Sequence, residues 1–164
     1  MSSKPITVLV ADDHAIMRQG LSSLLKDEGG FQVIGEAQTG REAVKMAQEL
    51  QPDVILMDIA MPVLNGLEAT RQIRSQNPEA KVIILSAHSE DIYVEQTVAA
   101  GVSGFIEKQS SSDILAQAIR DVVKGGVYFS PAIARRRRRQ SDAEAKGKNV
   151  SLTSRENEVL QLVA

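Results

Sequence analysis

The sequence of 164 residues contains no cysteine and no tryptophan, and aromatic residues make up only 3% of it. Without cysteine the chain can form neither disulfides nor thiolate metal sites. No apolar run approaches the roughly 18 residues that a transmembrane helix needs, and residues 1–5 lack the apolar segment of a signal peptide. These absences favour a cytoplasmic protein with no membrane partner and with a core of aliphatic side chains.

Charge is distributed unevenly along the chain. The formal net charge is −2, but residues 1–125 carry a net −6 and residues 126–164 a net +4. An acidic part followed by a basic part is typical of a protein with two different partners. The sequence therefore predicts an acidic domain, followed by a basic tail.

Short apolar runs alternate with helically spaced apolar residues. The expected strands are Ile6–Ala11, Phe31–Ala37, Val54–Met57, Lys81–Ser86 and Val102–Ile106. A helical pattern follows each strand, and Gly or Pro residues mark most of the helix ends. Five strand–helix units predict an α/β fold, a flavodoxin-like, doubly wound parallel sheet of five strands in the order 2-1-3-4-5.

Two of the expected helices carry recognisable start signals. Thr39 and Glu42 have the spacing of a capping box, with Thr39 as the cap and Glu42 reaching back. Ser110, Ser111 and Ser112 offer caps for the fifth helix. These signals predict that the second helix starts just after Thr39 and the fifth near Ser110–Ser112.

Acidic residues follow two of the expected strands. Asp12 and Asp13 end the first strand, and Asp58 ends the third. In the order 2-1-3-4-5 these two strands are neighbours, so the three carboxylates share the crevice where such sheets bind ligands. Close carboxylates repel one another unless a cation lies among them, and oxygen ligands suit Mg²⁺. The alternatives are that Asp58 caps the next helix, or that the carboxylates form a solvated rim without metal.

The ends of the fourth and fifth strands add two further groups. Ser86 provides a hydroxyl and Lys108 a cation. A hydroxyl, a cation and a metal together neutralise the charge of a phosphoryl group in transfer. Asp58 can then act as the nucleophile and form an aspartyl phosphate.

As a set, these residues resemble the receiver domain of two-component response regulators. The matching positions are Asp12 and Asp13 for the acidic pair, Asp58 for the phosphoacceptor, Ser86 for the switch hydroxyl and Lys108 for the lysine. The resemblance covers roughly residues 5–125. It implies phosphorylation of Asp58 by a sensor histidine kinase, and a binding switch in place of enzymatic turnover.

The resemblance also implies roles for residues that the spacing alone does not single out. Phe105 falls at the switch aromatic, which is expected to move with Ser86 towards the phosphoryl group and to become more buried. Ala60 falls at the position that binds Mg²⁺ through its backbone carbonyl, beside the ligands Asp12, Asp13 and Asp58. Gln109 departs from the family, because many receivers have proline there.

Two histidines lie near the expected crevice. His14 and His88 could each be a base or a metal ligand, although imidazoles would make the site softer than Mg²⁺ prefers. We expect His14 to cap or pack against the first helix and His88 to tune the access of water.

The tail contains five consecutive arginines, Arg135–Arg139, which either contact DNA phosphates or form a solvated charge run. Residues 151–164 resemble the start of a LuxR-type helix-turn-helix domain, in the pattern Leu-Thr-x-Arg-Glu-x-Glu-Val-Leu. This resemblance points to the NarL/FixJ class, with DNA binding by the full-length protein and a homodimer on phosphorylation. The expected parts are a receiver domain (1–125), a linker (126–150) and a DNA-binding domain (151–164) truncated before its recognition helix.

Two other functions fit the same fold. A Mg²⁺-dependent phosphatase with an aspartyl nucleophile usually has an acid two residues further on, where this chain has Ala60. A flavin- or nucleotide-binding module would need a glycine-rich loop after the first strand, where Asp12 and Asp13 stand. The sequence disfavours both.

Overall fold

A parallel sheet forms the centre of the computed structural model, which describes residues 4–87, 91–108 and 110–129. The sheet has six strands in the order β2-β1-β3-β4-β5-β6. The strands are β1 Ile6–Ala11, β2 Phe31–Ala37, β3 Val54–Asp58, β4 Val82–Ser86, β5 Gly104–Glu107 and β6 Tyr128–Phe129. The doubly wound fold and the order of the first five strands are confirmed.

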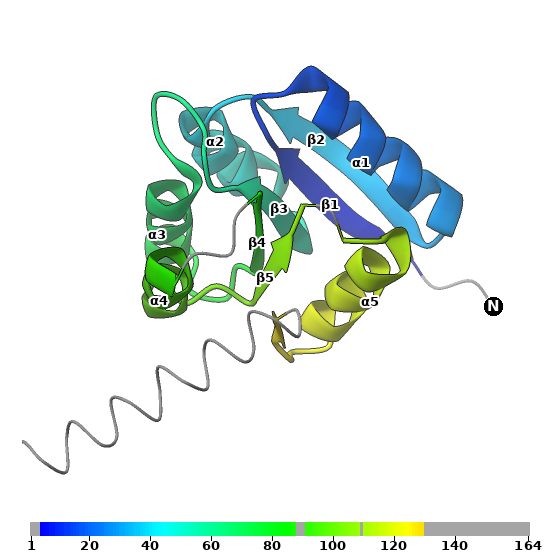
Figure 1. Ribbon diagram of the computed structural model, residues 1–164. Coiled ribbons are helices and arrows are strands. Elements are labelled where there is room, and N and C mark those ends of the chain that lie inside the picture. Colours follow the sequence, from blue (N-terminus) through cyan, green and yellow to red (C-terminus); the bar gives the residue numbers. More distant parts are fainter. Residues whose placement is uncertain (1–3, 88–90, 109, 130–164) are drawn as a thin grey trace, which may run out of the picture.

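Helices cover both faces of this sheet (Figure 1). They are α1 Ala15–Glu28, α2 Gly40–Leu50, α3 Gly66–Gln76, α4 Asp91–Ala99 and α5 Ser112–Val123. α1 and α5 lie on one face, and α2, α3 and α4 lie on the other. Among the described residues, no helix combines the length and the apolarity that crossing a bilayer requires.

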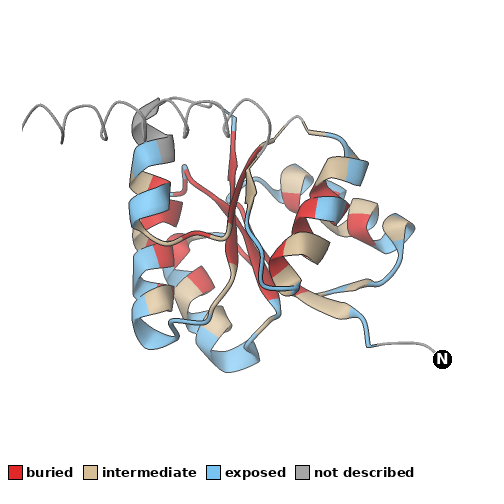
Figure 2. Ribbon diagram, turned by 90° about the horizontal axis from the view of Figure 1, so that it is seen from below, coloured by how far each residue is buried: buried red, intermediate tan, exposed pale blue. Residues whose placement is uncertain are grey.

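The central strands β3 and β4 are buried along their whole length, as Figure 2 shows. Their side chains divide between two aliphatic cores, one under each helix layer. Burial of one large aliphatic side chain contributes roughly 1.5–3 kcal/mol. The apolar runs of the sequence thus become a rigid platform, and the residues at their carboxyl ends are held by the most buried part of the fold.

The predicted helix starts are confirmed, with one difference in detail. The Glu42 N–H donates to Thr39 Oγ1 at 3.1 Å, but the Glu42 carboxylate accepts from the N–H of Gln38, one residue earlier than a capping box places it. Ser111 caps α5 by accepting from the Ile114 N–H at 3.4 Å. Local side-chain hydrogen bonds therefore set where these helices begin.

The sixth strand lies beyond residue 125, where we expected the receiver domain to end. Tyr128 pairs with Gly104 and Phe129 pairs with Phe105, in parallel. The strand is only two residues long, so it has no alternating pattern that a sequence could display. The sheet thus continues into the segment that we expected to be linker.

Candidate functional site

Four strands bring their carboxyl ends to one edge of the sheet. Asp12 follows β1, Asp58 ends β3, Ser86 ends β4 and Lys108 follows β5. The register places the end of each strand beside its neighbour's, with Ser86 opposite Glu107. The structure therefore brings together the residues that the sequence predicted at this edge.

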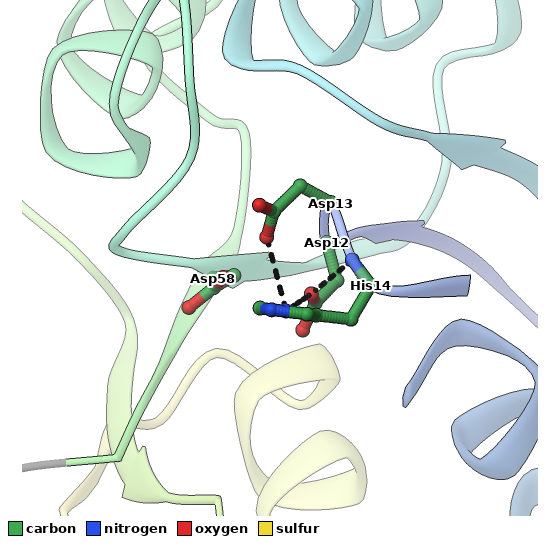
Figure 3. A group of neighbouring side chains, drawn as sticks. All are labelled: Asp12, Asp13, His14 and Asp58. Carbon is green, nitrogen blue, oxygen red and sulfur yellow. Dashed lines mark hydrogen bonds and ion pairs between the residues drawn. The ribbon is translucent and has the colours of Figure 1, made fainter. Parts of the chain in front are cut away.

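The carboxylates form a tight cluster with a histidine (Figure 3). Ligand atoms of Asp12, Asp13, His14 and Asp58 all lie within 4.8 Å of one another. Asp12 and Asp58 are buried, with 1% and 2% of their surface exposed, while 30% of the Asp13 side chain is exposed. Such a cluster of oxygen atoms fits a hard divalent cation, reached from the solvent on the side of Asp13.

Lys108 contacts both buried carboxylates of this cluster. Its Nζ atom is 3.1 Å from Asp12 Oδ2 and 3.2 Å from Asp58 Oδ1. Burial lowers the pKa of Lys108, but the hydrogen bonds and negative charges of Asp12 and Asp58 outweigh it and raise the pKa above its ordinary value. The lysine is therefore charged at neutral pH and bridges the two buried carboxylates.

Asp58 is held in an unfavourable environment. Its pKa is raised, first by burial and second by the charge of Asp12, although Lys108 and the N–H of Ala60 oppose the shift. The Ala60 N–H donates to Asp58 Oδ1 at 3.3 Å. Asp58 Oδ2 is buried and has no hydrogen-bond partner in the described part of the chain. An unsatisfied buried oxygen is costly, and a metal ion or an electrophilic phosphorus atom would satisfy it.

The backbone of Asp12 is held at both its N–H and its carbonyl. Its N–H donates to the carbonyl of Ala37 at 3.0 Å, and its carbonyl accepts from Arg18 Nη1 at 2.7 Å. In the described part of the chain, Asp12 Oδ2 has no hydrogen-bond partner besides the ion pair with Lys108 Nζ, 3.1 Å away. The ion pair therefore leaves this oxygen with free capacity for a water molecule or a metal.

The expectation that His14 caps or packs against the first helix is wrong. His14 occupies the N-cap position of α1, but its side chain makes no capping hydrogen bond and is 68% exposed. Figure 3 shows the ring turned onto the acidic pair, with Nδ1 at 3.1 Å from both Asp12 Oδ1 and Asp13 Oδ1. The carboxylates attract the imidazole more than the helix end does.

The loop after Asp58 approaches the site closely. A Cβ atom on Gly66 would lie 2.0 Å from the backbone oxygen of Asp58, so no larger residue fits there without movement. Asn65 caps α3 by accepting from the Glu68 N–H at 2.8 Å. The pair Asn65-Gly66 thus starts α3 directly against the end of β3.

Ser86, the last residue of β4, and Phe105, near the start of the neighbouring strand β5, are both buried, with 1% and 0% of their surface exposed. Ile84 and Phe129 lie in register on either side of Phe105. We expected Phe105 to become more buried on phosphorylation. In this structure the ring is already fully buried, so it has no exposed surface left to bury.

Sequence reasoning missed Arg18 and Glu36. Arg18 is 9% exposed and lies on the buried face of α1 with Leu21 and Leu25. An arginine on an apolar helical stripe was the available signal. His88, Gln109, Arg135–Arg139 and the expected helix-turn-helix start at 151–164 lie outside the described residues.

A model of the family described as "Response regulator receiver domain" matches residues 8–120. The chain belongs to this family. Its relatives include response regulator GacA of Pseudomonas aeruginosa, 43% identical over 129 residues that cover 79% of this chain and 60% of the relative. The transcriptional regulatory protein DegU of Brevibacillus brevis is 34% identical, with coverage of 99% and 76%. The chain thus spans about 60% of the length of GacA and three quarters of DegU.

Solved structures agree with this assignment. A LuxR-family two-component response regulator from an Aurantimonas species superposes with a TM-score of 0.80 at 32% identity, over 84% of this chain and 99% of that chain. The receiver domain of NarL from Mycobacterium tuberculosis gives a TM-score of 0.72 at 33% identity, over 75% and 99%. The protein is therefore a response regulator similar to the LuxR- and NarL-type members, and the phosphatase alternative is not favoured.

Proposed function

We propose that this response regulator is switched by phosphorylation of Asp58, with a sensor histidine kinase in the cytoplasm as the phosphoryl donor. The observation that carries the proposal is the state of Asp58. Its carboxylate is buried, its pKa is raised, and Oδ2 has no hydrogen-bond partner in the described part of the chain, while Lys108 lies beside Oδ1. This is a nucleophile with available lone pairs and with a cation at hand.

The acidic cluster supports a Mg²⁺ site. Asp13 and Asp58 would hold the ion directly, Asp12 mainly through water, and Ala60 through its backbone carbonyl. The unsatisfied Oδ2 of Asp58 and the free capacity of Asp12 Oδ2 fit this assignment. When bound, the ion supplies positive charge to the oxygens of the phosphoryl group in transfer.

In the phosphoryl transfer, Asp58, Lys108 and Ser86 have separate roles. A carboxylate oxygen of Asp58 attacks the phosphorus of the kinase phosphohistidine, the new O–P bond forms, and the N–P bond breaks with its electron pair left on the imidazole nitrogen. Lys108 exchanges its contact with Asp58 for a phosphoryl oxygen, and the Ser86 hydroxyl donates to another. Lys108 and Ser86 neutralise the negative charge of the phosphoryl oxygens, and Asp58 alone acts as the nucleophile.

The output of the switch is binding. Ser86 would relay the change to the surface, with Phe105 shifting inside its buried site and not gaining burial, and this change would strengthen a homodimer and regulate DNA binding. In this proposal the receiver domain extends through β6 to Phe129, a linker follows up to residue 150, and residues 151–164 begin a LuxR-type DNA-binding domain. The similarity to LuxR-family regulators supports this arrangement.

Acetyl phosphate tests the phosphoacceptor directly. With Mg²⁺, the wild-type chain should gain the mass of one phosphoryl group, and Asp58→Asn should gain none. Asp53→Asn, at the other end of the same strand, is the matched control and should be modified like wild type. An unmodified wild type, or a modified Asp58→Asn, would refute the proposal.

A further inference from the structure

A second charged pair adjoins the acidic cluster at β2, which flanks β1 on the side opposite β3. Arg18 on α1 donates from Nε to Glu36 Oε1 on β2 at 3.2 Å. The same guanidinium donates from Nη1 to the backbone carbonyl of Asp12 at 2.7 Å. The Arg18 side chain is 11% exposed and that of Glu36 is 43% exposed. One buried guanidinium therefore connects α1, β2 and the acidic loop.

The carbonyl that Arg18 binds belongs to the peptide group between Asp12 and Asp13. Because that group is planar, fixing its oxygen also fixes the direction in which the chain enters Asp13. The Asp13 carboxylate is part-exposed, and within the described ranges it pairs with the exposed ring of His14, which holds it only weakly. The relative orientation of the two carboxylates therefore depends on the hydrogen bond from Arg18.

Arginine suits this task because its donors are fixed in one plane. Glu36 takes one donor and sets the orientation of the plane, so that another points at the Asp12 carbonyl. Lysine has one ammonium group on a flexible stem and would not reproduce both contacts in this geometry. The positive charge of Arg18 by itself would repel a cation at the cluster, so any gain in cation binding must come from geometry.

We propose that Arg18, oriented by Glu36, is a positioning residue that aligns Asp12 and Asp13 to hold a divalent cation. This role rests on the proposed function and extends it to residues that touch neither the phosphoryl group nor the cation. Loss of an outer partner of a metal ligand typically weakens metal binding about 10–100-fold. Charge alone predicts the opposite sign, because removal of a nearby positive charge favours cation binding.

The test is calorimetric titration of the full 164-residue chain with Mg²⁺, in the absence of any phosphoryl donor. Arg18→Gln should bind Mg²⁺ about tenfold more weakly than wild type, although it has lost a positive charge. Arg18→Lys keeps the charge and should also bind more weakly. With acetyl phosphate, both variants should need more Mg²⁺ to reach their maximal rate of phosphorylation.

The matched control is Arg74→Gln. Arg74 also donates from Nη1 to a backbone carbonyl, that of Ala80, at 2.7 Å, but at the opposite edge of the sheet. The Arg74→Gln variant should be less stable than wild type and should bind Mg²⁺ with the same affinity as wild type. If Arg18→Gln does not fold, Arg18→Lys decides, because it retains the ion pair with Glu36.

The outcomes separate this role from the proposed function. If wild type takes up no phosphoryl group on Asp58, the proposed function fails, and the positioning role fails with it. If wild type is phosphorylated while Arg18→Gln and Arg18→Lys bind Mg²⁺ as tightly as wild type or more tightly, only the positioning role is overturned. Equal weakening in Arg74→Gln would likewise overturn it, because the effect would then be one of stability.

Discussion

Strand β3 has an aspartate at each end, and the two are treated very differently. Asp53, just before the strand, accepts from the Thr7 N–H at 2.9 Å and donates its own N–H to Thr7 Oγ1 at 2.8 Å. Asp58, its last residue, is 2% exposed and keeps one oxygen without a hydrogen-bond partner in the described part of the chain. Asp53 joins two strands, whereas Asp58 lies in an environment that costs stability, which fits the phosphoacceptor role that we propose for it.

Of the variants considered, Lys108→Met should have the largest effect on the environment of Asp58. Lys108→Met leaves two buried carboxylates without their cation, which typically costs about 3–5 kcal/mol of unfolding free energy. Mg²⁺ should restore much of the loss, because it supplies positive charge to the same oxygens. Urea unfolding with and without Mg²⁺ measures both effects. A loss that Mg²⁺ leaves unchanged would contradict the assignment.

Gly66→Ala tests how closely the loop must approach Asp58. The added Cβ would meet the Asp58 backbone oxygen at 2.0 Å, so the loop has to move, at a cost of about 3 kcal/mol. Gly20→Ala is the control, because a Cβ there meets nothing within 4 Å and should stabilise α1 by about 0.5–1 kcal/mol. Thermal unfolding of both variants checks the prediction, and equal melting temperatures would refute it.

Asp58→Asn should stabilise the protein at neutral pH, by about 2 kcal/mol without Mg²⁺, since it removes an unfavourable buried charge. The pKa of Asp58 is raised in the folded state. Asp58 therefore contributes its full stabilisation below pH 3.8, its ordinary pKa. This contribution is lost as the pH rises through the pKa of Asp58 in the folded state.

The advantage of Asp58→Asn over wild type should accordingly appear between pH 3.8 and the folded pKa and stay constant above it. The raised pKa of Lys108 lies above 10.5 and adds no slope in this range. Urea unfolding of the two proteins side by side at several pH values gives the difference. A difference that does not vary with pH would mean that Asp58 titrates normally.

The other end of the strand should show the smallest effect. Asp53→Ala loses one hydrogen bond at an exposed position and should cost about 1 kcal/mol of unfolding free energy. Phosphorylation by acetyl phosphate should proceed at the wild-type rate. A slower rate in this variant would show that the two ends of β3 are coupled, and the comparison would need revision.

Much of the fold could be predicted because β3 and β4 are continuous apolar runs that end in polar residues. The strand order then placed Asp12, Asp58 and Lys108 at one edge without any knowledge of side-chain contacts. Strand β6 could not be predicted, because two residues carry no periodicity. The predicted end of the receiver domain at residue 125 therefore lies before the last strand of the sheet.

Side-chain directions limited the prediction of the site. His14 was expected to serve the helix that it precedes, but the nearby carboxylates attract its ring. Arg18 and Glu36 are 18 residues apart, and only the packing of α1 on β2 brings them to the Asp12 carbonyl. Strand ends follow from local pattern, whereas contacts between layers depend on tertiary structure.

The short strand β6 also has a consequence for handling the protein. Gly104 lets it approach closely, since a Cβ there would lie 2.8 Å from the Tyr128 oxygen. A polypeptide cut at residue 125 would uncover the backbone of β5 and one side of Phe105. Open strand edges pair with one another between molecules, so such a fragment should aggregate, and one extended through Phe129 should remain dispersed.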